Sequence, residues 1–232
     1  MVEKIKMKIL NLYACLGGNR FKWDEVAEAA GIEIEVTAVE LDPELARMYQ
    51  ERFPNDIVII ADAHQYLLDH YKEFDFIWSS PPCPSHSKIN ISQYTRESWK
   101  PRYPDMMLYE EIIFLDHFFK GRYCIENVVP YYDPLIEANK RGRHLYWTNF
   151  NLPNILSTRK SPDFTRIKDE YIVLSEFHDI KGIPANTGGY RNVLRNLVDY
   201  EAGKKIFETA LEIINRPKRK MESLFDEQFT EI

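Results

Sequence analysis

The sequence has few cysteines and no paired cysteine spacing. Cys15, Cys83 and Cys124 are the three cysteines in 232 residues, and they are far apart along the chain. A disulfide framework needs an even set of cysteines, and a structural zinc site needs closely spaced pairs. We therefore expect neither kind of cross-link and no metal site. A reducing intracellular compartment fits this composition.

Long apolar runs and a positive net charge are also missing. Residues 1–14 begin charged and become apolar only for the length of one strand, so we expect no signal peptide, no membrane span and a cytoplasmic protein, in a bacterial cell or a phage-infected host. The net charge of -6 argues against nonspecific coating of nucleic acid, although a local basic surface would still hold a phosphate backbone. The length and the 44% hydrophobic content predict one main domain with a small lobe.

The chain does contain a regular alternation of strand and helix patterns. Apolar runs of strand length lie at residues 7–14, 32–40, 56–62, 74–80 and 122–129. Helical spacing is present at residues 22–31, 42–53, 63–71 and 105–119. Asp42 and Pro43 are typical of a helix start, and Gly31 is typical of a helix end. This alternation predicts an α/β fold with a mostly parallel, Rossmann-like sheet and helices on both faces.

The pattern weakens after residue 128. We expect a loop with a short helix over 130–142, then a strand or edge hairpin over 143–152, a strand over 170–177 and a helix over 199–214. The predicted division is a catalytic domain at 1–150, a small recognition lobe at 151–190, a returning helix at 191–215 and a solvated tail at 216–232.

Polar and special residues follow the predicted strands at the edge where an α/β sheet binds its ligand. They are Gly17 and Gly18, then Glu40, Asp62, Pro82 with Cys83, and Glu126 with Asn127. An acidic residue such as Glu40 suits ribose hydroxyls, and the prolines around Cys83 hold it in an extended loop. Taken singly, each residue also has an ordinary explanation: a turn glycine, a solvated acid or a buried structural cysteine.

Seven motifs occur in a defined order: "NLYACLGG", "VELDP", "ADA", "SSPPCPSHS", "ENV", "NKRGR" and "RNLVDYEAGKKIFETAL". Together they resemble the cytosine-C5 DNA methyltransferase family, over about residues 7–150 and 191–214. Cys15 stands where the family has glycine, and Pro84 stands where it has glutamine. The resemblance implies an S-adenosylmethionine-dependent enzyme of restriction-modification type that methylates a cytosine flipped out of double-stranded DNA.

The same resemblance assigns the site residues. The catalytic group would be Cys83 as nucleophile, Glu126 as acid and Arg143 as the base-contacting arginine. The S-adenosylmethionine site would consist of Tyr13, Leu16, Gly17, Gly18, Glu40, Leu41, Asp62, Ala63, Pro82, Asn196 and Val198. The DNA contacts would come from Ser87, Lys88, Arg96, Lys100, Arg102 and Arg141.

Several alternatives stay open at this point. An RNA cytosine-C5 methyltransferase would keep every catalytic residue, and a noncatalytic DNA-binding homologue would tolerate the changes at Cys15 and Pro84. An unrelated thiol enzyme would need a histidine, and His86 is the nearest. The segment before the last motif is short, with a basic cluster at 157–168, which predicts a compact, monomeric enzyme with short or relaxed sequence preference.

Overall fold

The computed structural model describes residues 5–92, 99–160, 170–180 and 190–214. A seven-stranded sheet forms the centre of the molecule, in the order β3-β2-β1-β4-β5-β7-β6. Its strands are β1 (Lys6–Leu12), β2 (Glu33–Glu40), β3 (Ile57–Ile60), β4 (Phe76–Ser79), β5 (Arg122–Val128), β6 (Asn139–Arg141) and β7 (His144–Thr148).

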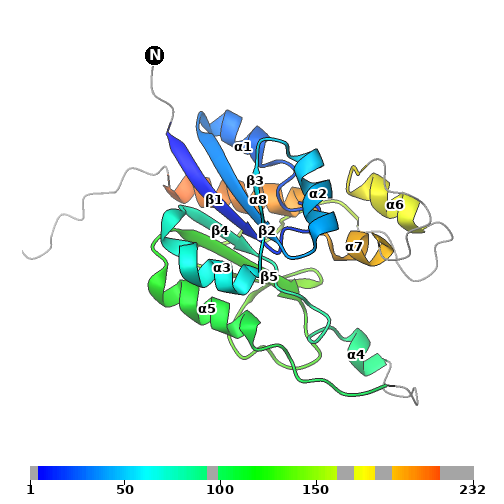
Figure 1. Cartoon of the computed structure of the whole chain (residues 1–232). Coiled ribbons are helices and arrows are strands. Elements are labelled where there is room, and N and C mark those ends of the chain that lie inside the picture. Colours follow the sequence, from blue (N-terminus) through cyan, green and yellow to red (C-terminus); the bar gives the residue numbers. More distant parts are fainter. Residues whose placement is uncertain (1–4, 93–98, 161–169, 181–189, 215–232) are drawn as a thin grey trace, which may run out of the picture.

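Helices cover both faces of this sheet (Figure 1). The helices of the described residues are α1 (Trp23–Ala30), α2 (Pro43–Arg52), α3 (Ala63–His70), α4 (Ile89–Ser92), α5 (Met107–Phe118), α6 (Glu170–Phe177), α7 (Tyr190–Asn196) and α8 (Tyr200–Ile214). A 3-10 turn, η1 (Tyr71–Glu73), follows α3. In Figure 1, α4 projects from the body, well apart from the pair formed by α6 and α7.

The first five strands are parallel to one another. In the register of the ladders, Ile9 of β1 lies opposite Val36 of β2 on one side and Phe76 of β4 on the other. β7 runs antiparallel to both β5 and β6. The prediction of a mostly parallel sheet with helices on both faces is therefore confirmed. The chain changes direction across the sheet between β1 and β4, which is the position where such sheets form their ligand crevice.

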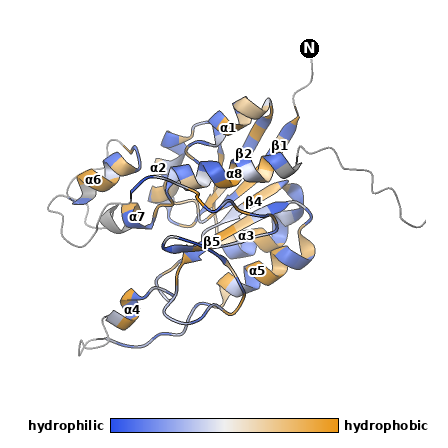
Figure 2. Ribbon diagram, turned by 180° about the vertical axis from the view of Figure 1, so that it is seen from behind, coloured by the Kyte–Doolittle hydropathy of each residue, from blue (hydrophilic) through white to orange (hydrophobic). Residues whose placement is uncertain are grey.

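Two apolar layers hold the helices to the sheet. On one face, Trp23 of α1 and Phe207 of α8 pack with Phe76, and on the other, Leu67 of α3 and Leu115 of α5 lie in a second cluster. All five side chains are at most 2% exposed. Figure 2 shows the apolar colour concentrated along the strands between these helices. This two-sided burial explains why the strands read as continuous apolar runs.

Local signals in the sequence set several boundaries. The Asp42 carboxylate accepts hydrogen bonds from the backbone of Glu44 and Leu45, with Pro43 at the first helical position of α2. Gly31 ends α1 in the left-handed conformation, at φ 70°. Both agree with the sequence expectation, because each signal acts within a few residues of itself.

The strand predicted over residues 170–177 is wrong, because these residues form helix α6. An apolar run of eight residues fits a buried strand or a buried helix equally well. Here Leu174 packs with Leu194 of α7 and with Leu16, so one helical face is buried away from the sheet. The strand predicted within 143–152 is confirmed as β7, but its hairpin partner β6 lies at 139–141, in a segment predicted as a loop with a short helix. The helix predicted over 199–214 is α8. The single returning helix predicted over 191–215 is divided in the structure into α7, which begins at Tyr190, and α8. The predicted tail lies outside the described residues.

Among the described residues, no helix is long and apolar enough to cross a lipid bilayer.

Candidate active site

A cavity of about 650 Å³ opens at the carboxyl ends of β1, β2, β4 and β5. Eleven of the residues predicted from the sequence line it: Tyr13, Gly18, Glu40, Leu41, Asp62, Ala63, Pro82, Cys83, Glu126, Asn196 and Val198. Its size is typical of a small-molecule or cofactor site. Residues from both ends of the chain therefore converge on one site.

The turn after β1 has an unusual backbone that glycine favours. Tyr13, Cys15 and Gly17 have φ values of 54°, 49° and 66°. A Cβ atom added to Gly17 would lie 2.4 Å from Phe53 Cε2, and one added to Gly18 would lie 2.5 Å from the Val198 carbonyl oxygen. Cys15 thus occupies a conformation that side chains rarely adopt. The two glycines allow the turn to pack closely on α2 and on residue 198.

Glu40 holds this turn from the neighbouring strand. Its Oε2 accepts a hydrogen bond of 2.8 Å from the backbone N–H of Cys15, and its Oε1 accepts one of 3.0 Å from the N–H of Asp42. The carboxylate therefore joins the ends of β1 and β2 at the cavity. Each oxygen keeps a lone pair with which to accept from a ligand hydroxyl.

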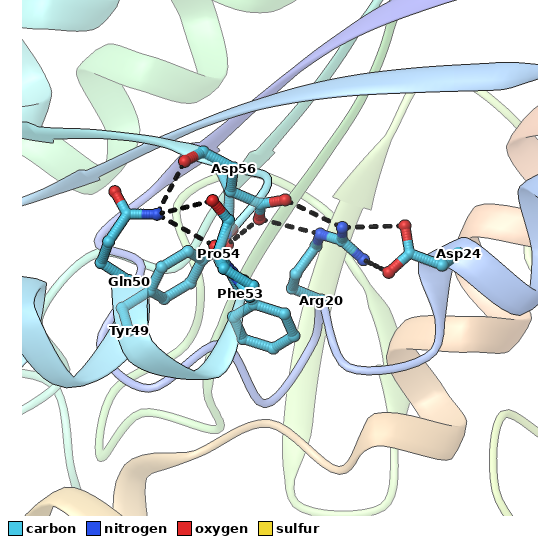
Figure 3. Close-up of polar contacts among 8 residues, drawn as sticks. Arg20, Asp24, Tyr49, Gln50, Phe53, Pro54 and Asp56 are labelled. Carbon is cyan, nitrogen blue, oxygen red and sulfur yellow. Dashed lines mark hydrogen bonds and ion pairs between the residues drawn. The ribbon is translucent and has the colours of Figure 1, made fainter.

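A buried polar network lies beneath the turn (Figure 3). The Arg20 guanidinium donates to both carboxylate oxygens of Asp56, at 3.0 and 2.9 Å, and also donates to Asp24. The Tyr49 hydroxyl donates to Asp56 at 2.8 Å, and the Arg20 and Asp56 side chains are only 4% and 3% exposed. This network fixes α2 against the segment that follows Gly18.

Glu111 is a buried carboxylate beside the cavity, and it was not among the site residues predicted from the sequence. It is 1% exposed and accepts hydrogen bonds of 2.6 Å from both the Tyr13 hydroxyl and the Ser79 hydroxyl. His64 Nδ1 lies 3.1 Å from the same carboxylate, and this hydrogen bond raises the pKa of His64. Tyr13 and His64 both line the cavity. The sequence signal for Glu111 was its place in the apolar stretch "EEIIFL". An acid buried there needs hydrogen-bond partners.

Cys83 lies in the loop that follows β4. Its carbonyl oxygen accepts hydrogen bonds of 3.0 Å from the backbone N–H groups of His86 and Ser87, which closes a turn. The Asn127 side chain donates to the Pro81 carbonyl at 3.0 Å, so β5 holds the proline pair in place. Burial raises the pKa of the Cys83 thiol, and the charge of Glu126 raises it further. At neutral pH the sulfur therefore carries its proton.

Glu126 reaches the same cavity from β5. Its side chain is 8% exposed, and its Oε1 lies 2.8 Å from Nδ1 of His144. His144 is the first residue of β7 and also lines the cavity. It was not among the residues predicted from the sequence. The sequence signal for His144 was its place directly after Arg143, at the start of β7, which pairs with the strand that contains "ENV".

The two predicted arginines lie on the other side of this hairpin. Arg141 and Arg143 line a second cavity of about 300 Å³, not the main one. The Arg141 guanidinium donates to the backbone carbonyls of Pro153, Leu152 and Lys140. The side chain that the structure places against Glu126 is therefore an imidazole.

The remaining predicted positions are outside the main cavity. Leu16 is buried against Leu194, and Gly17, within the turn, lies against Phe53. Ser87 and Lys88 follow the Cys83 turn, and Ser87 forms an isolated bridge with Pro130. Lys100 and Arg102 are exposed on the segment before α5. Arg96 lies outside the described residues, as do residues 161–168 of the basic cluster.

His86 was the candidate partner in the thiol-enzyme alternative. Its Nδ1 lies 2.5 Å from the Tyr132 hydroxyl, and its Nε2 is buried without a hydrogen-bond partner. The backbone of Tyr131 donates to the His86 carbonyl at 3.0 Å. His86 thus fastens the Cys83 loop to residues 130–132. In the part of the chain that the structure describes, no cluster of histidine, cysteine and acidic side chains is arranged to hold a metal ion.

The fold and this cavity together define an α/β protein with a Rossmann-like sheet and a ligand site at the carboxyl ends of its strands. The structure of the Entamoeba histolytica methyltransferase EhMeth is similar, with a TM-score of 0.53 over 92% of this chain and 100% of that one, at 10% sequence identity. At this identity the similarity concerns the fold. The model of the C-5 cytosine-specific DNA methylase family matches residues 7–128.

The chain therefore belongs to the C-5 cytosine-specific DNA methylase family. It is also 24% identical, over 260 aligned positions, to the Type II methyltransferase M1.BsuMI of Bacillus subtilis (strain 168). That alignment covers 97% of this chain and 57% of the relative, so the chain spans little more than half of the relative's length.

Proposed function

We propose that this protein transfers a methyl group from S-adenosylmethionine to C5 of a cytosine in DNA, with Cys83 as the nucleophile. The observation that carries the proposal is that Cys83 and Glu126 line the same cavity as the residues predicted to bind the cofactor. Membership of the family supports this choice of reaction.

The residues around the cavity fit S-adenosylmethionine. The glycines of the turn Tyr13–Gly18 let it pack tightly on Phe53 and Val198, and this tight turn borders the cavity in which the cofactor would bind. Glu40 would accept from the ribose hydroxyls, Asp62 from the adenine amino group, and Leu41 would pack on the adenine ring. When bound, the cofactor supplies an electrophilic methyl group on a sulfonium.

The proposed chemistry begins with Cys83. Its sulfur forms a bond to C6 of the cytosine while the C5–C6 double bond opens, which places electron density on C5 and N3. The raised pKa keeps the thiol protonated beforehand, and during the attack it passes its proton to the nearby Glu126 carboxylate. Glu126 then acts as the acid that donates this proton to N3 and accepts a hydrogen bond from the exocyclic amine. After methylation, a base such as water takes the C5 proton, the bond from Cys83 to C6 breaks, and N3 returns its proton to Glu126, which restores the ring.

We propose double-stranded DNA as the substrate. The cytosine would have to leave the helix at a cost of a few kcal/mol. Ser87, Lys88, Arg96, Lys100, Arg102 and Arg141 are proposed to hold the phosphate backbone, and the exposure of Lys88, Lys100 and Arg102 suits that role. Residues 1–150 would form the catalytic part and 151–190 a small recognition lobe.

The test is incubation with methyl-labelled S-adenosylmethionine and mixed-sequence duplex DNA, followed by mass spectrometry of the nucleosides. The wild-type protein is expected to produce 5-methylcytosine, and Cys83→Ala is expected to produce none while still binding the cofactor. Cys15→Ala is the matched control, because Cys15 lines the same cavity. This variant is expected to remain active at saturating cofactor. Labelling of tRNA instead of DNA would reassign the substrate. Activity in Cys83→Ala would refute the mechanism.

A further inference from the structure

Glu126 is a buried acid, and its burial raises the question of what stabilises it. Its side chain is 8% exposed, and an unpaired carboxylate in such a place is costly. His144 Nδ1 lies 2.8 Å from its Oε1. No second ion pair of Glu126 is found within residues 5–92, 99–160, 170–180 and 190–214. His144 is therefore its charged partner in the described structure.

The sheet holds this pair rigidly. In the antiparallel ladder of β5 and β7, His144 lies opposite Val128, and Glu126 lies opposite Tyr146. The two side chains thus meet diagonally across neighbouring strands, within reach for long side chains. The His144 ring also lies 6.4 Å from the Tyr146 ring. Both backbones are fixed by ladder hydrogen bonds, so the contact needs little further ordering.

We propose that His144 is the positioning residue of the catalytic acid: its imidazolium holds Oε1 of Glu126 and leaves Oε2 directed at the cytosine. This inference rests on the proposed function. It gives His144 the task that the family resemblance gave to Arg143, because His144 lines the main cavity and Arg143 does not.

The charges around His144 decide when it is an imidazolium. Burial lowers the pKa of His144, Glu126 raises it through charge and hydrogen bonding, and the net change is a rise. Arg143 lowers the pKa and Asp199 raises it. The ionisable groups that surround the pair on the packed elements are Cys124 and Glu126 of β5, Arg143, Tyr146 of β7, Arg195 of α7, Asp199 and, beyond Glu126, Cys83.

A raised pKa has a definite sign in its effect on activity. His144 is fully protonated below the ordinary histidine pKa of ~6.5, and it loses this proton as the pH rises through its higher pKa in the folded protein. The pairing with Glu126 is lost with it. The rate is therefore expected to fall at high pH when His144 is present, and an arginine at this position is expected to remove that fall.

Proton titration tests the pair without any need for activity. In NMR spectra of the full chain labelled at histidine C2, the His144 signal is assigned by its absence in His144→Gln. Its pKa is expected to lie above the ordinary histidine value and to drop in Glu126→Gln. The signal of His70, an exposed histidine paired with Glu73, is the internal reference and is expected to be the same in both proteins. An unchanged His144 titration in Glu126→Gln would overturn the proposal.

Kinetics test the positioning role. His144→Gln is expected to lower kcat on the order of 100-fold with the cofactor KM unchanged, and His144→Arg to restore kcat and keep it at high pH. His70→Gln is the matched control and is expected to behave as wild type. A His144→Gln protein with unchanged kcat, or an arginine variant with the wild-type pH profile, would refute the role. If the wild-type protein methylates neither DNA nor RNA, the proposed function and the catalytic role fail together, while the titration still decides whether the pair exists.

Discussion

Cys83 is a thiol whose surroundings oppose its ionisation. Burial and the nearby Glu126 both raise its pKa. A nucleophilic cysteine that rested as a thiolate would need a cation or a helix N-terminus beside it. In the proposed mechanism the thiolate is therefore expected to form only when the substrate is in place, which protects Cys83 from reaction with other electrophiles.

This arrangement predicts the rate at which iodoacetamide alkylates Cys83. The rate is expected to be low at pH 8 and to keep rising beyond the range where free cysteine titrates, about pH 8.5. In the Glu126→Gln variant, Cys83 is expected to be alkylated faster at the same pH, because one cause of its raised pKa is removed. Peptide mass spectrometry of timed samples measures both rates.

Two controls assign that signal. Burial also raises the pKa of Cys15, to about 12, and that of Cys124, so both are expected to react slowly. Glu137→Gln changes an exposed glutamate, and Cys83 in this variant is expected to be alkylated at the wild-type rate. Equal rates in wild type and Glu126→Gln at every pH would show that the carboxylate does not act on the thiol.

At the scale of elements, the turn after β1 and helix α2 form one unit. The Phe53 ring lies 4.8 Å from the Tyr49 ring and 5.2 Å from the Arg20 guanidinium, measured between centroids or to the guanidinium carbon. The ring is thus held on several sides directly beneath Gly17. Close packing here explains why the turn requires glycine and not merely a small residue.

Gly17→Ala and Gly142→Ala form a matched pair for this point. Both glycines have positive φ, 66° and 60°, but a Cβ on Gly142 would meet nothing within 4 Å. Gly142→Ala is expected to cost about 1–2 kcal/mol of unfolding free energy from backbone strain alone. Gly17→Ala is expected to cost about 1–3 kcal/mol more, because its methyl group overpacks the site against Phe53.

Urea denaturation of the two variants measures the difference, and calorimetry measures cofactor binding. Gly17→Ala is expected to lose cofactor affinity, and Gly142→Ala, on the β6–β7 turn, is expected to keep it. Equal losses of unfolding free energy in the two variants would show that Phe53 moves away from the added methyl group at no cost.

At the scale of the whole molecule, the C-terminal helix completes the core and the site. Phe207 of α8 is fully buried, 5.3 Å from the Trp23 ring and 5.4 Å from the Phe76 ring, while residues 196–198 just before α8 line the main cavity. The packing of α8 against α1 and the sheet therefore also supports the cavity wall.

Phe207→Ala is expected to lower the unfolding free energy by about 3–5 kcal/mol, because it leaves a cavity in the core. Phe118→Ala removes a ring that is 59% exposed at the end of α5, and it is expected to change stability by about 0.5 kcal/mol or less. Urea denaturation with and without S-adenosylmethionine provides the comparison. A small loss in Phe207→Ala would mean that α8 docks independently of this ring.

The sequence by itself determined the local and repeated features. Capping residues such as Asp42, turn glycines and the alternation of apolar runs act within a few neighbours, so the α/β fold and most strand ends were predictable. The residues Cys83 and Glu126 were predictable as a pair, because carboxyl ends of parallel strands meet at one edge. Their roles remain predictions.

Tertiary structure decided what lies across strands and between distant helices. The sequence could not show that His144, and not Arg143, faces Glu126, because a shift of one residue at the start of a strand reverses the face of the side chain. It could not show Glu111 beneath Tyr13, since they are 98 residues apart. It also could not choose helix for residues 170–177, because the contact with α7 that buries Leu174 is absent from the local pattern.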